Sequence, residues 1–166
     1  MSETLTAEAT AALRLEVEAL LFREAAFLDR RDFEGWIGLY TDDAIYWIPS
    51  MADDVDPARQ VSIVYDDYGR LRERVWRLDS GLAYAQEPFS RTLHLVGNVD
   101  VVHAAGDEVH VESALVVTEF RRDRQFLHSA RCRHELRREG GELRITLKKI
   151  ELINNDGHLG NLSLLL

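Results

Sequence analysis

The clearest pattern in the chain is an alternation of apolar and polar residues between positions 109 and 154. On the first run, one parity holds Val109, Val111, Leu115 and Val117. This two-residue period is that of a pleated strand with one buried face. A polar break at positions 121–124 and the pair Gly140-Gly141 separate three such runs, and the glycines can adopt the positive φ of a two-residue turn. The pattern predicts an antiparallel meander of three long strands.

Helical periodicity is confined to the first half of the chain. Apolar residues recur at three- and four-residue steps from Thr6 to about Arg30, and Thr6 is placed to cap that helix. Asp32 is placed to cap a short second helix with a broad aromatic face. A third helix is expected after Asp67, marked by four apolar positions: Leu71, Val75, Leu78 and Leu82.

Shorter runs complete the predicted elements. Strands are expected at positions 44–48, ended by Pro49, and at 61–65, with a loop over 51–59 as the segment best suited to contact a partner. Another strand is expected at 92–103, with one face made of Leu93, Leu95, Val99 and Val101. Helices followed by successive strands predict an α+β fold in one domain over residues 1–166. We expect a strongly curved, mostly antiparallel sheet with three helices over its concave face and a pocket between them.

The charge balance narrows the choice of partners. The chain of 166 residues has 29 acidic and 20 basic side chains, a formal net charge of -9, and residues 1–60 hold 13 acidic against 5 basic ones. Such a field repels phosphate backbones, so nucleic-acid binding is disfavoured. No apolar run approaches the ~20 residues of a membrane span. With no signal-peptide pattern and a single cysteine, a cytoplasmic location is expected.

The six histidines are candidates for metal ligands or proton carriers. His128 and His134 share a strand face but lie about 20 Å apart along it, too far for one ion. His94 and His128 could approach across strands, with Asp42 or Asp43 nearby, although a hydrogen-bonded core histidine is the commoner case. Cys132-Arg133-His134 has the form of half a Rieske signature, but the chain has no second cysteine for the other half.

Arginines are concentrated around positions 70–77 and recur at 91, 131 and 133. Arginine suits paired, partly buried carboxylates, so structural or subunit-interface ion pairs are favoured over a site for an anionic substrate. The apolar tail, residues 159–166, must be covered by its own domain or by another subunit.

Four segments together resemble a known family. They are residues 40–49 (YTDDAIYWIP), 66–78 (DDYGRLRERVWRL), 88–99 (PFSRTLHLVGNV) and 148–156 (KKIELINND). In this order they are similar to blocks of the small (beta) subunits of aromatic-ring-hydroxylating dioxygenases. The matches span nearly the whole chain, which makes the set more specific than any one of them.

The resemblance implies an NTF2-like, or cystatin-like, cone and an α3β3 hexamer with beta–beta contacts. It also implies that the Rieske [2Fe-2S] cluster and the mononuclear Fe(II) belong to the alpha subunit. Electrons would come from NAD(P)H through a reductase and often a ferredoxin, for the catabolism of an aromatic compound. This chain would then be mainly structural, with no cofactor, metal or catalytic residue of its own. Candidate subunit-interface residues are Trp47, Pro49, Arg74, Arg77, Arg91, Asn98 and Arg131.

The alternative is a free-standing enzyme of the same fold class, similar to ketosteroid isomerase or scytalone dehydratase. Such an enzyme would use pocket carboxylates and histidines for proton transfer. Its candidate residues are Asp42, Tyr46, His94 and His128. A pocket filled by Trp36, Phe27 and Leu78 would contradict this alternative.

Overall fold

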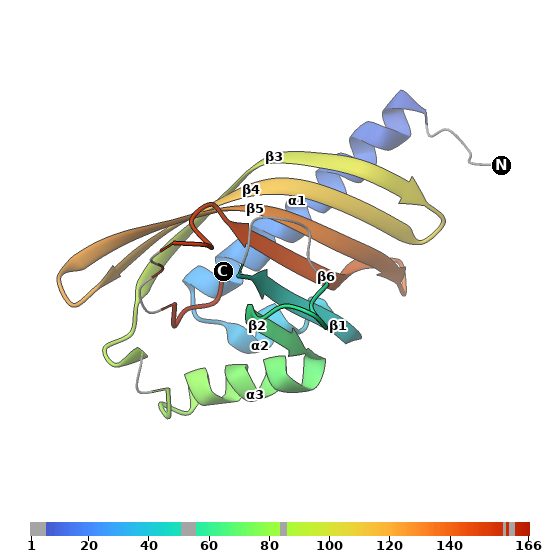
Figure 1. Ribbon diagram of the computed structural model, residues 1–166. Coiled ribbons are helices and arrows are strands. Elements are labelled where there is room, and N and C mark those ends of the chain that lie inside the picture. Colours follow the sequence, from blue (N-terminus) through green and yellow to red (C-terminus); the bar gives the residue numbers. More distant parts are fainter. Residues whose placement is uncertain (1–5, 51–55, 84–85, 158, 160–161) are drawn as a thin grey trace.

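A single six-stranded sheet forms the body of the protein in the computed structural model (Figure 1). The structure describes residues 6–50, 56–83, 86–157, 159 and 162–166. The strand order is β2-β1-β6-β5-β4-β3, and β1 with β6 is a parallel pair between antiparallel ones. The strands are β1 (Tyr40–Pro49), β2 (Ser62–Asp67), β3 (Arg91–Ala105), β4 (Glu108–Arg121), β5 (Arg124–Glu139) and β6 (Glu142–Leu152). The predicted meander is β4, β5 and β6.

Three capped helices precede the meander. They are α1 (Ala7–Asp29), α2 (Phe33–Ile37) and α3 (Tyr68–Asp79). The side chains of Thr6, Asp32 and Asp67 each accept a hydrogen bond from a main-chain N–H of the first turn, as N-caps do. The predicted extension of the third helix to Leu82 is wrong. α3 ends at Asp79, before Gly81 at φ +72°, and Leu82 is exposed.

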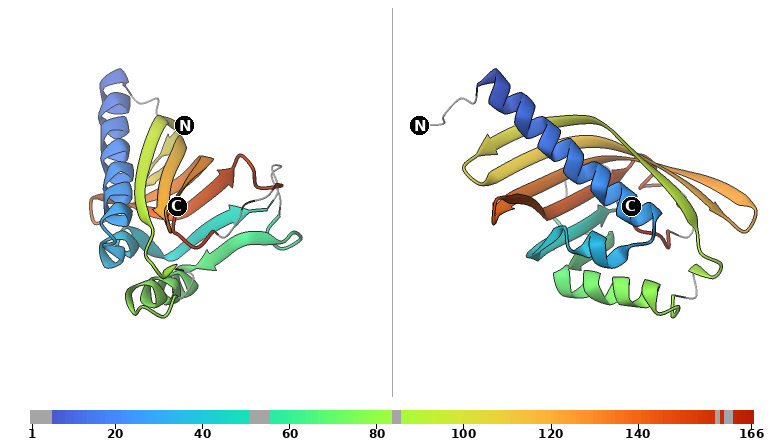
Figure 2. Two further views of the ribbon diagram at one scale, coloured as in Figure 1. Left: turned by 90° about the vertical axis from the view of Figure 1, so that its left-hand side faces the viewer. Right: turned by 180° about the vertical axis from the view of Figure 1, so that it is seen from behind.

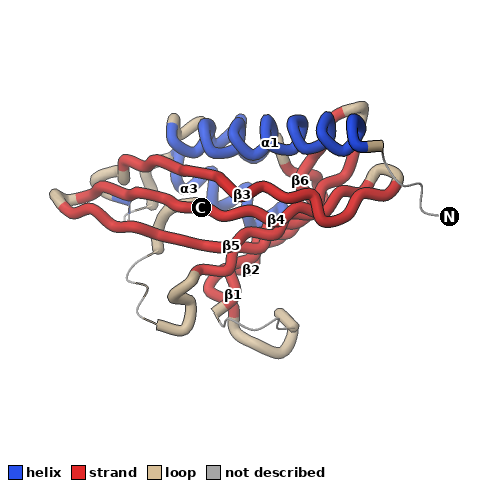
Figure 3. The backbone as a smooth tube through the Cα atoms, turned by 90° about the horizontal axis from the view of Figure 1, so that it is seen from above, coloured by secondary structure: helices blue, strands red, loops and turns tan. Residues whose placement is uncertain are grey.

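The helices lie on one side of the curved sheet, so the fold class predicted from the sequence is confirmed. α1 runs along the sheet beside β3, α3 lies below β1 and β2, and α2 contacts both α1 and α3 (Figure 2). Seen from above, α1 covers one face and leaves the opposite face open (Figure 3). We call this opposite side the outer face. None of the helices in the described part of the chain is long and apolar enough to cross a membrane.

Strand β3 changes face halfway along its length, which the sequence pattern did not predict. Leu93 and Leu95 are exposed whereas Val99 is buried, although all three were expected on one face. The pairing with β4 shifts between Gly97 and Asp100, and Asn98 has φ +51°. An extra residue in one strand reverses the orientation of the side chains that follow it, here up to a second shift between Val101 and His103. The apolar side of the first half of β3 therefore lies on the outer face.

The end of the chain is covered by its own domain. Leu165 and Leu166 are 5% and 1% exposed and belong to the main hydrophobic cluster. The tail therefore closes the space between the helices and the sheet.

Of the predicted loop over positions 51–59, residues 51–55 lie outside the described part.

Candidate functional site

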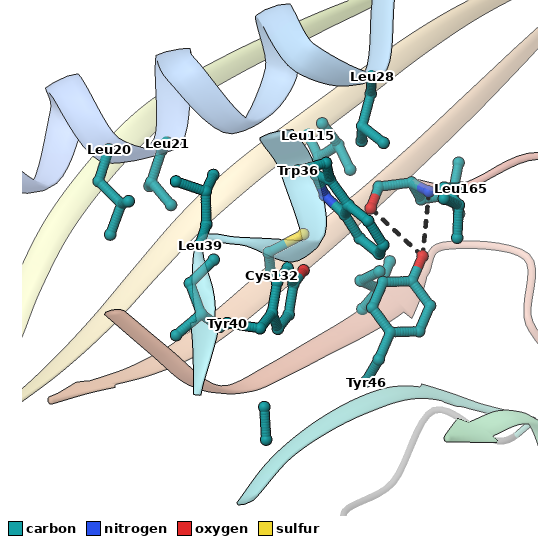
Figure 4. Packing of buried hydrophobic residues seen from close by; sticks show 14 of the residues in the cluster. Leu20, Leu21, Leu28, Trp36, Leu39, Tyr40, Tyr46, Leu115, Cys132 and Leu165 are labelled. Atoms are coloured by element: carbon teal, nitrogen blue, oxygen red, sulfur yellow. Dashed lines mark hydrogen bonds between the residues drawn. The ribbon is translucent and has the colours of Figure 1, made fainter. Parts of the chain in front are cut away.

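Large aromatic side chains fill the space between helices and sheet. Trp36, Tyr40 and Tyr46 are at most 1% exposed, and their rings pack together, with centroids 4.9 Å apart for Trp36 and Tyr40 and 5.9 Å apart for Trp36 and Tyr46 (Figure 4). Leu78 is also buried and Phe27 packs against the same cluster. Beside His94 a cavity of about 20 Å³ remains, which is room for about one water molecule.

A buried ion pair lies beneath these aromatic rings. Lys148 Nζ donates to Glu24 Oε1 at 2.8 Å, and both side chains are 4% exposed. The same carboxylate oxygen accepts from the Tyr40 hydroxyl at 2.8 Å and from Trp36 Nε1 at 3.2 Å. Burial alone would raise the pKa of Glu24, but the Lys148 ammonium holds that pKa well below its usual range. Glu24 is therefore an ionised, fully engaged anchor that ties α1 to α2, β1 and β6.

His134 completes this cluster without a hydrogen bond. Its Nε2 lies 3.7 Å from Glu24 Oε2, and neither ring nitrogen has a partner among the described residues. Burial lowers the pKa of His134 below its ordinary value despite the nearby carboxylate, so the ring is neutral at pH 7. Cys132 lies on the same strand face, and burial raises the pKa of its thiol to about 12. Neither group is poised as a proton carrier or nucleophile at neutral pH.

The fold does not bring the whole alternative catalytic set together, although Tyr46 and His94 both contact main-chain atoms of Leu165 and Leu166. Asp42 is exposed on β1, and its neighbour Asp43 is paired with Arg137 at 2.9 Å. Tyr46 is buried, and burial raises the pKa of its hydroxyl. His94 on β3 and His128 on β5 both pair with Val117, which lies between them on β4. Each ring is bound to a different carboxylate, so the two histidines do not form one site.

Each of these two histidines is bound to a carboxylate that the sequence did not single out. His94 Nδ1 lies 2.6 Å from Asp29 Oδ1, at the last residue of α1. His128 Nε2 lies 2.9 Å from Glu119 Oε2, and Ser90 Oγ donates to the other oxygen of Glu119. The first contact joins α1 to β3, 65 positions apart in the chain, whereas the second joins the neighbouring strands β4 and β5. Both histidines thus match the expectation of a hydrogen-bonded core histidine, and not that of a shared metal or acid–base site.

A metal-binding cluster is likewise missing from the part of the chain that the structure describes, where no three His, Cys, Asp or Glu side chains converge. His128 and His134 are on one strand, as expected, and serve different clusters. The described interior thus supports packing and anchoring.

Three of the seven predicted interface residues share the outer face. The Arg91 guanidinium lies over the Phe120 ring, 4.7 Å from its centroid. Asn98 and Arg131 are exposed and line one depression of about 530 Å³ together with Glu112 and Arg133, among others.

The other four occupy different environments. Arg77 is exposed on α3, while Arg74 is bound to Asp66 within the chain at 2.7 Å. Trp47 is 8% exposed, lies under the Lys149 ammonium and donates from Nε1 to Ser62 Oγ at 2.9 Å. Pro49 is buried at the end of β1. Trp47, Pro49 and Arg74 are thus engaged mainly by their own chain.

Comparison with known proteins gives one consistent result. The family model described as "Ring hydroxylating beta subunit" matches residues 23–156. The small oxygenase component of the p-cumate 2,3-dioxygenase system of Pseudomonas putida is 38% identical over 138 residues, which is 82% of this chain and 77% of that protein. The biphenyl 2,3-dioxygenase subunit beta of Rhodococcus jostii (strain RHA1) is 29% identical over 160 residues, covering 90% and 86% of the two chains.

Solved structures agree in fold. The beta subunit of benzoate 1,2-dioxygenase from Burkholderia mallei superposes with a TM-score of 0.74 at 24% identity, covering 98% of this chain and 99% of that one. A chain of naphthalene 1,2-dioxygenase with bound indole reaches a TM-score of 0.80 at 18% identity, covering 98% and 95%. A cystatin-like protein from Nostoc punctiforme is also similar, with a TM-score of 0.58 at 20% identity, covering 89% and 93%.

Proposed function

Because the chain belongs to the family of ring-hydroxylating beta subunits, we propose that it is a non-catalytic small subunit that holds the alpha subunits of an aromatic-ring-hydroxylating dioxygenase in one assembly. In this proposal the alpha subunit carries the Rieske [2Fe-2S] cluster and the mononuclear Fe(II), and receives electrons from NAD(P)H through a reductase and, in many systems, a ferredoxin. The proposed assembly is an α3β3 hexamer in the cytoplasm.

The observation that carries the proposal is an exposed apolar patch on the outer face. Its exposed members lie on neighbouring strands or just after β6: Leu93, Leu95, Leu127 and Ile153, each at least 65% exposed. Leu93 and Leu127 both pair with Thr118, so they flank one position of β4. Ile153 bonds to Ser129, whose partner Val116 also pairs with Leu95. We call these four leucine and isoleucine side chains the outer patch.

Contiguous apolar side chains of this kind mark association surfaces on soluble proteins, whereas single exposed ones do not. The outer patch adjoins the depression lined by Asn98 and Arg131, so an apolar and a charged area lie side by side. An apolar centre with a charged border is the usual composition of a subunit interface. This composition supports a partner on the outer face. The same face carries three of the interface residues predicted from the sequence, Arg91, Asn98 and Arg131.

The interior supports the non-catalytic part of the proposal. Its aromatic side chains occupy the space where an enzyme of this fold would need a pocket, and its carboxylate is held by Lys148, Tyr40 and Trp36. A group engaged on all sides has no free position for a substrate. The effect of this chain on the reaction would then come through assembly.

The experiment compares two leucines of equal exposure on different faces. Leu95, at 66% exposed, lies in the outer patch, and Leu15, at 67% exposed, lies on α1. Each is changed to lysine in a tagged chain that is expressed in its own host, and the native mass and iron content of the purified material are measured. We expect Leu95→Lys to reduce co-purified alpha subunit and iron more than tenfold, and Leu15→Lys to leave both unchanged.

Thermal melting of each variant chain alone separates assembly from folding, because both sites are on the surface and should change the midpoint little. Full recovery of an iron-containing assembly with Leu95→Lys would contradict the outer-face interface. A wild-type chain that never co-purifies with an alpha subunit or iron would contradict the subunit role itself.

A further inference from the structure

Three buried side chains of the domain bind main-chain atoms of Leu165 and Leu166 in the tail. Tyr46 Oη accepts a hydrogen bond from the Leu166 N–H at 3.0 Å and also lies 3.3 Å from the Leu166 oxygen. Lys148 Nζ donates to that same oxygen at 2.7 Å. One residue earlier, His94 Nε2 lies 3.2 Å from the Leu165 oxygen. Donors and an acceptor from three strands therefore match a short stretch of extended peptide.

These contacts form a built site because its polar members are themselves fixed and buried. Lys148 is 4% exposed and is oriented by Glu24, while the His94 side chain is 2% exposed and is oriented by Asp29. Tyr46 is packed edge-on against Trp36. Groups that are already oriented lose little freedom when a ligand binds, which favours recognition.

Apolar surroundings supply the second half of the site. Leu165 and Leu166 are 5% and 1% exposed and join the cluster that contains Leu28, Trp36 and Leu78. Burying two such side chains drives binding, while the hydrogen bonds fix their direction. Gln86 Nε2 donates to Ser163 Oγ at 2.7 Å and fixes the segment that enters the site.

We propose that Tyr46, Lys148 and His94 form a binding site for a short apolar peptide segment, and that Leu165 and Leu166 of the same chain occupy it as an internal ligand. The chemical class follows from the contacts: a branched apolar residue that presents an N–H donor and an oxygen acceptor to Tyr46 and Lys148. Emptied of its tail, the site accepts a leucine dipeptide. The inference concerns the interior and is independent of the proposed subunit role.

The test removes the internal ligand and supplies it from solution. A chain that ends at Leu164 lacks Leu165 and everything after it, and the probe is N-acetyl-leucyl-leucine. At about ten times its dissociation constant, the probe should raise the melting midpoint of the shortened chain by about 3–6 °C and leave that of the full chain unchanged. N-acetyl-glycyl-glycine has the same main-chain groups without the apolar side chains and should produce no shift.

A second variant checks the polar contacts. Tyr46→Phe in the shortened chain removes the hydroxyl that bonds the peptide main chain and should weaken probe binding about fivefold to tenfold in calorimetry. If the shortened chain does not fold alone, refolding is measured with and without 10 mM probe, roughly the concentration needed for millimolar binding. Folding that depends on the probe supports the site. Failure to fold with the probe overturns it, as does equal stabilisation by both probes or by the Tyr46→Phe chain.

Discussion

Lys148 Nζ on β6 lies 2.8 Å from Glu24 Oε1 on α1, and this contact joins two residues that are 124 positions apart in the chain. Both side chains are almost fully buried, so each charge has exchanged water for the other and for neighbouring hydroxyl and indole groups. The pair fixes α1 against the last strand at the centre of the fold. It also orients the ammonium group that holds the tail.

Removing one member of this buried pair should lower the free energy of unfolding much more than removing a pair on the surface. Glu24→Gln and Lys148→Met each leave a buried charge without its partner, and we expect each to lower the free energy of unfolding by ~3–5 kcal/mol. In a double-mutant cycle the two changes should couple by about 1–3 kcal/mol, because the double variant buries neither charge. Urea unfolding followed by circular dichroism measures all four chains.

The matched control is the pair Arg14 and Glu18, which is one turn apart on α1, with side chains 59% and 22% exposed. Arg14→Gln should change the free energy of unfolding by less than about 0.5 kcal/mol. If Arg14→Gln and Lys148→Met were equally destabilising, the central role given to the buried pair would be wrong.

The stability of the fold should fall as the pH falls from 7 towards 5. Burial lowers the pKa of His134 below its unfolded value of 6.5, so in this range the unfolded chain binds a proton that the folded chain does not. Unfolding is then favoured by lower pH, with a slope of at most about 1.4 kcal/mol per pH unit for one proton. Below about pH 4.5 the stabilisation from Glu24, whose pKa is also lowered, is lost in the same direction.

Urea unfolding at a series of pH values tests this dependence. His134→Leu should flatten the limb between pH 7 and 5, even if the variant is less stable overall. His103→Gln changes an exposed histidine on β3 and should keep the slope. If the free energy of unfolding of His134→Leu fell with pH as steeply as that of the wild type, other groups would be responsible for the pH dependence.

Cys132 should be unreactive while the protein is folded. Burial raises the pKa of its thiol to about 12, so almost no thiolate is present at pH 8, and the sulfur is shielded from reagents. Labelling with a disulfide reagent such as DTNB should be slow in buffer and complete, at one thiol per chain, in guanidinium chloride. Rapid labelling of the folded chain would show that β5 opens locally.

Regular periodicity allowed the sequence to predict the meander, the α+β class and the helix caps at Thr6 and Asp32. Each of these depends on neighbours within a few residues, which are visible in the sequence. Glu24 was missed although it carries a local signal: it lies three residues after Leu21 and four before Leu28, on the buried stripe of α1. A charged residue in that position needs a partner.

The identity of that partner could not be read from the chain. Lys148 faces inward only because the pairing of β5 with β6 shifts between Glu135 and Leu136, which reverses the parity set by Leu143 and Ile145. Asp29, which binds His94, likewise comes from an element distant in the sequence. Such contacts depend on tertiary register, which local periodicity does not encode.

The same kind of shift in β3 gives the last prediction. Asn98 has φ +51°, a left-handed conformation that asparagine and glycine adopt more readily than other residues. Asn98→Gly should therefore change the free energy of unfolding by less than about 0.5 kcal/mol, whereas Asn98→Val should lower it by about 1–2 kcal/mol. Thermal melting of both variants provides the comparison.

The consequence should extend beyond stability, because this shift turns Leu93 and Leu95 to the outer face while Val99 stays in the core. A valine that relaxes the strand towards regular pairing would disturb the outer patch, so Asn98→Val should also weaken co-purification of the alpha subunit, and Asn98→Gly should not. Equal stability and equal assembly for the two variants would show that the left-handed residue is not what sets the face of β3.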